Sequence, residues 1–400
     1  MMRRFFPLLA LAAIPTLADT VAVLPFWNSG ASAASQSNLD WIGESIAETV
    51  RESLGSRGIL TLERSDLDDA FRSLNLRQRA PLSEASVIKI GELLDAEQAI
   101  SGTFEFTAEA AASGAGMRGS LKITARIVDR RKLRLGPEFT ETGALEDLAT
   151  LQAHLAWRAL ALLAPKLAPP ESEFRSIQTP IRLDAEENYV RGLLARDPLQ
   201  KEKFFLQAAH LDARFNHPCY QLGQMHYQRK EYRDAAEWLE KVGAEYIHYR
   251  EASFLLGLAR FQSGDYAGAQ KAFQMIAATV PLGEVYNNLG ASESRRNLPQ
   301  AIDDFRKASD GDPNDGVYRF NLGYALWKKG DFAAAADQFR AVLNRNPDDQ
   351  MATLLLGRSL KKQAFHATVD ARLAALERLK TEYQERAYWQ LKSMLDSKPQ

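Results

Sequence analysis

The stretch "NLGYALWKKGDFAAAADQF", residues 321–339, decides the fold of this chain. It places an alanine twelve residues after Gly323 and a phenylalanine four residues later. The same offsets follow two earlier glycines, leading to Ala235 and Leu239 after Gly223 and to Ala269 and Phe273 after Gly257. Six such glycines recur at intervals of 31, 34, 33, 33 and 34 residues: Gly192, Gly223, Gly257, Gly290, Gly323 and Gly357. A fixed period near 34 predicts a stacked array of helix pairs.

Close packing explains the residue types within each repeat. Glycine and alanine let two helices approach, a large apolar side chain fills the gap beside them, and proline ends the second helix. Pro281, Pro313 and Pro347 close three units, and "GDY" at 264–266 and "GDF" at 330–332 form turns. These motifs resemble the tetratricopeptide repeat family over residues 183–369. The resemblance implies a helical solenoid that offers a binding surface to proteins or peptide segments.

Both ends of the array depart from the repeat pattern. The unit that begins near Asp184 has a shortened turn, "DPLQ". After Gly357, a long helix is expected from about Asp370 to Leu395, with one apolar stripe formed by Leu373, Leu376, Leu379, Tyr383, Ala387 and Leu391. Terminal units must cover the apolar face of a stack, so both ends are expected to be caps, with residues 370–400 as a capping helix. The alternative for the last helix is docking of a separate protein.

The tetratricopeptide resemblance also implies a place for the partner. The first helix of each repeat lines the concave face of such arrays. Read onto this chain, that rule gives partner contacts to Tyr220, Gln224, Tyr227, Phe254, Leu258, Phe261, Asn287, Phe320, Tyr324 and Trp327. Asn288 and Asn321, each two residues before a repeat glycine, match asparagines with which family members hold a peptide backbone.

The kind of segment that this surface would hold follows from its residue types. Phe320 and Tyr324 stand where family members that clamp a terminal carboxylate carry basic residues. We therefore expect an aromatic groove that accepts an apolar or proline-bearing segment, with Arg295 and Lys328 at its edge. The alternative is that these aromatic side chains only pack between neighbouring helices.

The first part of the chain follows other periodicities. Residues 1–18 combine two arginines, an apolar run and small residues at a cleavage spacing, a pattern typical of a secretory signal peptide. Strands are expected at "VAVLPFWN" (21–28), "GILTLE" (58–63), "AISGTFEF", "SLKITARIVD" and "PEFTETG". Helices are expected around 42–54, 64–76, 83–94 and 144–163. Together these elements predict an α/β domain at 19–165 with helices against a mixed sheet, and Pro165, Pro169, Pro170 and Pro180 predict a linker at 166–182.

Four segments in order carry a second resemblance: "VAVLPFWN", "LTLERSDLDDAFRSLNL", "IGELLDAEQAISGTFE" and "LKITARIVD". Glu63, Arg64 and Leu67 match a Glu-Arg-Ser-x-Leu motif, and Gly102 matches a Gly-Ser/Thr strand. The segments resemble the envelope domain of CsgG-like and FlgO-type proteins and, more distantly, TolB-type amino-terminal domains. That resemblance implies an interaction domain, with self-association among its uses. The lipid-anchor cysteine and long hairpins of the pore-forming member are missing from the sequence, so no channel is expected.

Composition and motifs narrow the function classes. Fifty basic residues balance 51 acidic ones, which gives no basic field for nucleic acid, and no integral membrane span is expected. Cys219, the only cysteine, is expected in a helical core, and its neighbours His217 and His226 do not complete a metal site. "GAGMRG" at 114–119 fits a nucleotide-binding pattern, but a strand follows it where a helix is needed. We expect no cofactor, no metal and no catalytic activity.

These observations combine into one expected architecture and function. The fold class is an α/β amino-terminal domain followed by an all-α tetratricopeptide solenoid. The expected function is that of a secreted or periplasmic, non-enzymatic adaptor that binds protein partners through its repeats. The alternative is a regulator or sensor of a cell-envelope enzyme or of a secretion or transport assembly.

Overall fold

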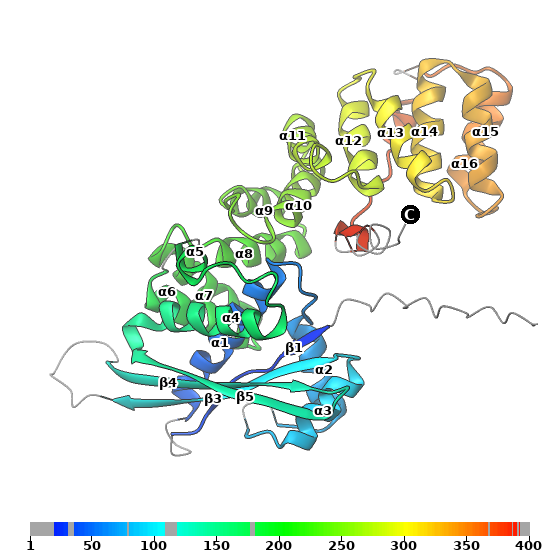
Figure 1. Cartoon of the computed structure of the whole chain (residues 1–400). Helices are drawn as coiled ribbons and strands as arrows, with labels where there is room; N and C mark the ends of the chain where they lie inside the picture. The colour runs from blue at the N-terminus through cyan, green and yellow to red at the C-terminus, as the bar shows by residue number, and fades with distance from the viewer. Residues whose placement is uncertain are drawn as a thin grey trace, which may run out of the picture. The chain divides into compact units, whose positions relative to one another are not determined.

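The computed structural model describes residues 20–30, 36–77, 80–108, 118–176, 181–366, 369–385, 387–389 and 392. The expected signal peptide and most of the "GAGMRG" loop lie outside these residues. The chain divides into two compact units, unit 1 from the start of the described chain to Asp212 and unit 2 over Ala213–Leu395 (Figure 1). No helix of the described part is both long and apolar enough to cross a membrane.

Unit 1 is built on a five-stranded mixed sheet. Its strands are β1 (Val21–Val23), β2 (Trp27–Asn28), β3 (Gln98–Ala108), β4 (Gly119–Asp129) and β5 (Arg134–Ala144). The order is β1-β3-β4-β5, and β2 also pairs with β3; β1 and β2 run parallel to β3, and the other pairs are antiparallel. Pro25 separates β1 from β2, because proline has no N–H to donate to a ladder. The strand expected at 58–63 is reduced to one bridge between Thr61 and Val21.

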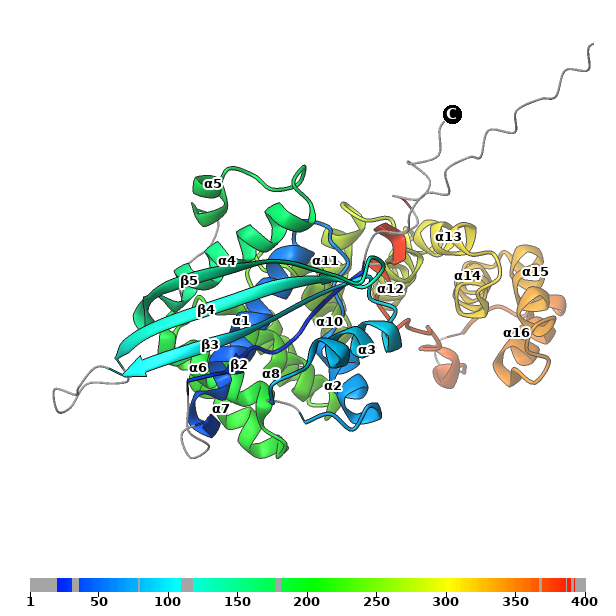
Figure 2. The same cartoon turned by 60° about the horizontal axis from the view of Figure 1, so that its bottom comes forward.

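Helices pack on both faces of this sheet (Figures 1 and 2). Phe104 of β3 faces Gly43 of α1, and Leu151 of α4 packs on Gly143 of β5. A second apolar cluster joins β1 to the α2 and α3 helices, with Phe71 among its members. The helices are α1 (Gln36–Gly55), α2 (Arg64–Ser73), α3 (Glu84–Leu93), α4 (Leu148–Leu163), α5 (Glu171–Ser176), α6 (Leu183–Leu194) and α7 (Pro198–Leu211).

The boundary between the units differs from the expected linker at 166–182. α5 lies within that stretch, and the Trp157 side chain donates a hydrogen bond to the Pro169 carbonyl at 2.9 Å. The α6–α7 pair belongs to unit 1, where Ser45 of α1 hydrogen-bonds to Glu186 of α6 and accepts a bond from Gln152 of α4 at 2.7 Å. These buried polar groups need each other, so the first helix pair stays with the α/β domain.

Over the described residues, the assigned α-helices of unit 2 form four pairs and one further helix. They are α8 (Asn216–Gln228) with α9 (Tyr232–Leu239), α10 (Tyr249–Gln262) with α11 (Tyr266–Ala277), α12 (Gly283–Arg295) with α13 (Ala301–Gly311), α14 (Gly316–Lys329) with α15 (Phe332–Leu343), and α16 (Gln350–Leu360). A Cβ added to Gly257 would lie 2.6 Å from the Phe273 ring. The small first-helix residue and the large second-helix residue therefore meet as the repeat pattern predicts.

The chain after α16 contradicts the expected capping helix. A 3₁₀ turn, Ala371–Leu373, is followed by a non-helical stretch over 374–384, and among the described residues helix is seen again at 385, 387–389 and 392. We call residues 371–385 the return segment. Its apolar residues pack on the core of unit 2, so the stripe exists, but on an extended chain: Leu373, Leu376, Leu379 and Tyr383. Helical spacing alone could not reveal that side chains of unit 2 hold the backbone of this segment.

The repeat glycines provide a test of this packing. Gly257→Ala should destabilise the array by about 1–3 kcal/mol, because the new methyl group overlaps the Phe273 ring. Gly357→Ala is the matched control: nothing lies within 4 Å of its added Cβ, and alanine is favoured over glycine in a helix by about 1 kcal/mol. Urea unfolding, with hydrogen exchange of α10 and α16, measures both. Equal destabilisation by the two changes would contradict the packing argument.

Candidate functional site

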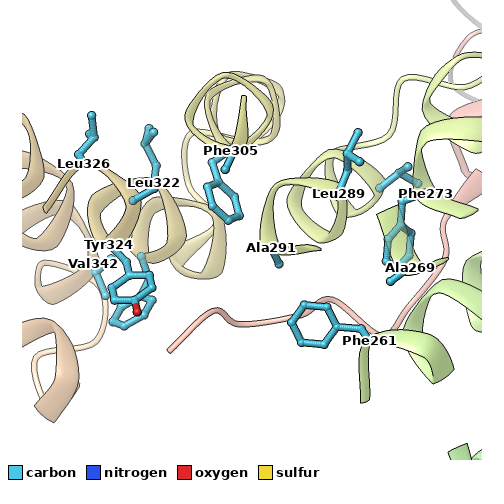
Figure 3. Close-up of a cluster of buried hydrophobic side chains, with 14 of the residues drawn as sticks. Phe261, Ala269, Phe273, Leu289, Ala291, Phe305, Leu322, Tyr324, Leu326 and Val342 are labelled. Atoms are coloured by element: carbon cyan, nitrogen blue, oxygen red, sulfur yellow. The ribbon is translucent and has the colours of Figure 1, made fainter. Parts of the chain in front are cut away.

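The candidate site is the surface of the first helices of unit 2 that meets the return segment. We call it the inner face; it is formed by α10, α12 and α14 and by the residues that begin α14 and α16. The Tyr324 hydroxyl donates to the Leu373 carbonyl at 2.5 Å, and Arg295 donates to the Ala375 carbonyl at 3.2 Å. In Figure 3 an extended stretch in the faint red of the C-terminal chain passes Phe261, Ala291 and Tyr324.

Two asparagines hold the backbone of the return segment, each by both the N–H and the carbonyl of one residue. Asn321 of α14 donates from Nδ2 to the Arg378 carbonyl at 2.7 Å, and its Oδ1 accepts from the Arg378 N–H at 2.9 Å. Asn288 of α12 does the same for Lys380, also at 2.7 and 2.9 Å. The bonded residues are two apart, which is the period of an extended strand. The pair therefore selects an extended backbone and leaves the side chains unspecified.

A third asparagine orients this pair. Asn287 donates to the Arg378 carbonyl at 2.9 Å and to Oδ1 of Asn288 at 3.1 Å, and its own Oδ1 accepts from Asn321 at 2.8 Å. All three asparagines are fully buried. Buried amides must be hydrogen-bonded, so each asparagine fixes the direction in which its neighbour points.

Ion pairs fix the side chains of the return segment. The Glu377 carboxylate, fully buried, accepts from Arg295 at 2.6 Å and from the Ser294 hydroxyl at 2.6 Å. Three further pairs follow: Arg378 with Asp349 through two bonds of 2.7 and 2.9 Å, Lys380 with Asp315 at 2.8 Å, and Glu385 with Arg250 at 2.6 Å. The inner face thus presents cationic and anionic groups in a fixed order along the segment.

Two acidic residues of the inner face, Asp315 and Asp349, also begin helices. Asp315 accepts from the N–H groups of Val317 and Tyr318 and caps α14, and Asp349 accepts from Ala352 and caps α16. The hydrogen bonds from Arg378 are the main cause that lowers the pKa of Asp349. Because a cap positions its carboxylate against the helix backbone, the charges that meet the return segment are held rigidly.

Aromatic side chains form the floor under the return segment. The Arg378 guanidinium lies 3.4 Å from the Phe320 ring centroid, and the rings of Tyr383 and Phe254 are 5.0 Å apart. Trp327 donates to the Gln363 carbonyl at 2.9 Å, just before the return segment. Cation–π and ring contacts of this kind add to the burial of apolar surface.

The structure separates the residues predicted for partner contact into three groups. One group meets the return segment: Phe254, Asn287, Asn288, Arg295, Phe320, Asn321 and Tyr324. Trp327 and Lys328 contact the chain just before it, at Gln363 and Phe365. The others have contacts within the helix array: Tyr220 stacks on His248, Tyr227 meets Tyr232 edge to face, Leu258 and Phe261 belong to the buried apolar cluster of unit 2, and Gln224 is half-buried on α8. Packing between helices, the stated alternative, describes this third group.

Sequence reasoning missed the charged residues that define the register. Asp315 and Asp349 each follow a repeat proline by two residues, in "DPNDG" and "NPDDQ", and an acidic residue before a helix is a cap signal. That signal identifies the helix start and not the ion pair. Arg250 and Glu284, which accepts from the Gln384 N–H at 2.8 Å, carried no sequence signal.

The histidines and the cysteine of unit 2 occupy separate environments. Cys219 is buried, which raises the pKa of its thiol, and the His217 ring packs on Tyr246. His226 instead lies with Glu231 and Asp234, with one ligand atom of each within 4.8 Å of the others. Both acidic residues are exposed, and His226 pairs with Glu231 at 2.6 Å. His217, Cys219 and His226, the sequence neighbours considered as metal ligands, are therefore not brought together.

Unit 1 contains a cleft that sequence analysis did not predict. It lies between α2 and the α6–α7 pair and is lined by several cationic residues, Arg64, Arg72, Arg77, Arg196 and Lys201, with Asp68 as its acidic member. Burial and the nearby Arg64 lower the pKa of Lys201. An excess of positive charge in a concave site attracts anionic groups.

Comparisons with known proteins identify the repeats. Residues 291–349 and 320–387 match the family model of the tetratricopeptide repeat. A 55-residue stretch is 38% identical to part of bacteriophage adsorption protein A of Escherichia coli (strain K12). The match covers 14% of this chain and only 6% of that protein. The helix pairs in the matched part of unit 2 are therefore tetratricopeptide repeats. The envelope-domain resemblance of unit 1 stays a prediction.

Two solved structures match parts of this chain. Residues 41 to the end of MamA from Desulfovibrio magneticus RS-1 match at 23% identity and a TM-score of 0.37, covering 42% of this chain and 95% of that one. YrrB, described as a TPR protein with an unusual peptide-binding site, matches at 21% identity and a TM-score of 0.35, covering 48% and 91%.

Glu293 gives the array a testable pH dependence. This α12 residue is buried beside Asp304, and burial together with that carboxyl raises its pKa to about 7. The folded state therefore holds a proton that the unfolded state releases near pH 4.5, so stability should fall as the pH rises from about 4.5 to 7.

The Glu293→Gln variant tests this. It keeps the shape of the side chain and removes the titration, so its thermal midpoint should exceed that of the wild type by a few degrees at pH 8 and match it near pH 5. Thermal scans of both proteins across this range are the measurement, with exposed Glu382→Gln as the control. A parallel pH profile of wild type and Glu293→Gln would contradict the assignment.

Proposed function

We propose that the protein is a non-catalytic scaffold that binds extended segments of partner proteins on the inner face of its repeats. One observation carries the proposal: Asn288 and Asn321 each bond both the N–H and the carbonyl of one residue in an extended chain. Such bonds do not depend on the side chains of the bound segment. They can therefore serve a polypeptide from another protein as well as the return segment.

The energetics favour a segment whose backbone matches the asparagines. Each intramolecular hydrogen bond contributes about 1 kcal/mol net, whereas a buried polar group left without a partner costs about 1–3 kcal/mol. The three asparagines are buried with the return segment in place. A segment that covered them without matching bonds would leave buried polar groups unsatisfied, whereas a backbone of matching geometry forms the bonds and avoids that penalty.

The wider role is also a proposal. The concave surfaces of helical repeat arrays are binding surfaces for protein or peptide segments, and the bonding groups of the inner face are those that a polypeptide needs. Unit 1, by its sequence resemblance, would connect the array to a cell-envelope component or to another copy of the chain. No cofactor or metal enters this role.

A peptide with the sequence of the return segment, residues 371–385, tests peptide binding. The full chain with Leu376→Asp and Leu379→Asp should release its own segment, because two partly buried apolar side chains lose their contacts and the inner face is unchanged. This release variant should bind the labelled peptide, measured by fluorescence anisotropy. Adding Asn288→Ala and Asn321→Ala should weaken binding at least a hundredfold. Each change removes the two hydrogen bonds of one asparagine, which we expect to cost about 1–3 kcal/mol of binding free energy.

Two controls accompany the measurement. Ala375→Asp lies at an exposed position of the return segment and should leave the wild-type behaviour unchanged. Gln224→Ala replaces a predicted contact residue that does not meet the segment and should not alter peptide affinity. Unchanged binding by the double asparagine variant, with helicity preserved in circular dichroism, would refute the backbone-holding role.

Export is the proposal for cellular location, and it rests on the sequence of residues 1–18. Expression of the full chain in a bacterium should yield a periplasmic or secreted form that begins after Ala18. Arg3→Glu and Arg4→Glu should slow processing, because the signal needs its positive amino end. Fractionation and N-terminal sequencing measure both, and an unprocessed protein that stays in the cytoplasm would reject the proposal.

A further inference from the structure

We infer that the return segment is a tethered competitor, and that the partner is an extended protein segment with the same order of charges. This inference rests on the proposed function and specifies its ligand. Read from the structure, the order is acidic at 377, basic at 378, apolar at 379, basic at 380, aromatic at 383 and acidic at 385. Each of these positions meets a complementary group of unit 2.

The charge order of the segment is specified because the complementary groups of unit 2 are held in fixed positions. A segment with another charge order would leave most of these groups without a partner. Glu377 has a fully buried side chain between Arg295 and Ser294, so a neutral or basic residue there would leave Arg295 facing no anion. Asp349 and Asp315 are held as helix caps and face the basic residues at 378 and 380. Unpaired charges at such positions are costly, which is how an interface rejects wrong partners.

Register follows from combining the backbone and side-chain contacts. Asn321 and Asn288 can bond residues two apart in any extended chain, so by themselves they permit several registers. Arg295 accepts only a segment whose acidic residue directly precedes the residue that Asn321 holds. The ion pairs thus choose which part of a partner lies on the asparagines.

Several features favour reversible rather than permanent occupancy. The return segment is joined by the chain alone, since the sole cysteine is elsewhere, and it has no regular helix or strand between 374 and 384. Its contacts include ion pairs whose basic partners are about one third exposed at Arg378 and Lys380. A segment held by such polar contacts opens more readily than a packed helix. As a tethered ligand it competes at an effective concentration on the order of millimolar.

The experiment compares two peptides of identical composition on two full-length proteins. One peptide copies residues 371–385, and the other exchanges the residues at 377 and 378. The proteins are the wild type and the release variant, Leu376→Asp with Leu379→Asp. The copied peptide should bind the release variant at least tenfold more tightly than the wild type, and the exchanged peptide should bind it at least thirtyfold more weakly than the copied one.

A charge-reversal pair shows that the pairing at 377 is direct. Arg295→Glu in the release variant should lose the copied peptide and gain at least tenfold for a peptide carrying Glu377→Arg. Hydrogen exchange of α12 and α14 checks that the array is folded in every variant. Light scattering should give the same mass for the wild type and the release variant, because the segment lies on its own chain and any association through unit 1 is common to both.

The outcomes separate the two proposals. Equal binding of the copied and exchanged peptides would overturn the charge order while leaving a peptide-binding face. Equal affinity of the wild type and the release variant, or exchange of return segments in a dimer, would overturn the tethered competitor. Absence of binding by both peptides to a folded release variant would instead reject the proposed function.

Discussion

Buried amides that must be hydrogen-bonded control the architecture of unit 2. Asn287, Asn288 and Asn321 are fully buried with the return segment in place, and their bonding groups match one extended backbone. The chain after α16 supplies that backbone in place of a helix. The inner face and the non-helical return segment are therefore two consequences of a single requirement.

That requirement works only because the repeats place the asparagines at a fixed spacing. Asn288 and Asn321 occupy equivalent positions in successive repeats, and close packing at Gly290 and Gly323 against Phe305 and Phe339 sets the helices in register. Because the repeats stack, equivalent asparagines of successive repeats bond residues that are two apart along the bound chain. The aspartates that cap α14 and α16 join the same alignment, since the start of a first helix lies at a repeated place.

In unit 1 a buried polar contact decides where the domain ends. The bonds that link Ser45 to Glu186 and Gln152 bring three helices together. They attach α6 and α7 to the sheet domain, although their sequence belongs to the repeat pattern. The proline-rich stretch therefore does not mark the boundary between the units. A helix pair whose sequence fits the repeat pattern can instead form the edge of the sheet domain.

The sequence by itself determined the elements whose cause is local or periodic. The spacing of the repeat glycines predicted the helix pairs, alternating apolar residues predicted β3, β4 and β5, and Ser83 predicted the start of α3. It also identified the asparagines and the aromatic residues Phe254, Phe320 and Tyr324 of the inner face. Tertiary structure alone decided what covers them, because Leu373, Leu376, Leu379 and Tyr383 fit a helical stripe as well as an extended chain. The choice between the two depends on partners about 60 to 90 residues earlier in the chain, which pattern reasoning over a short window cannot see.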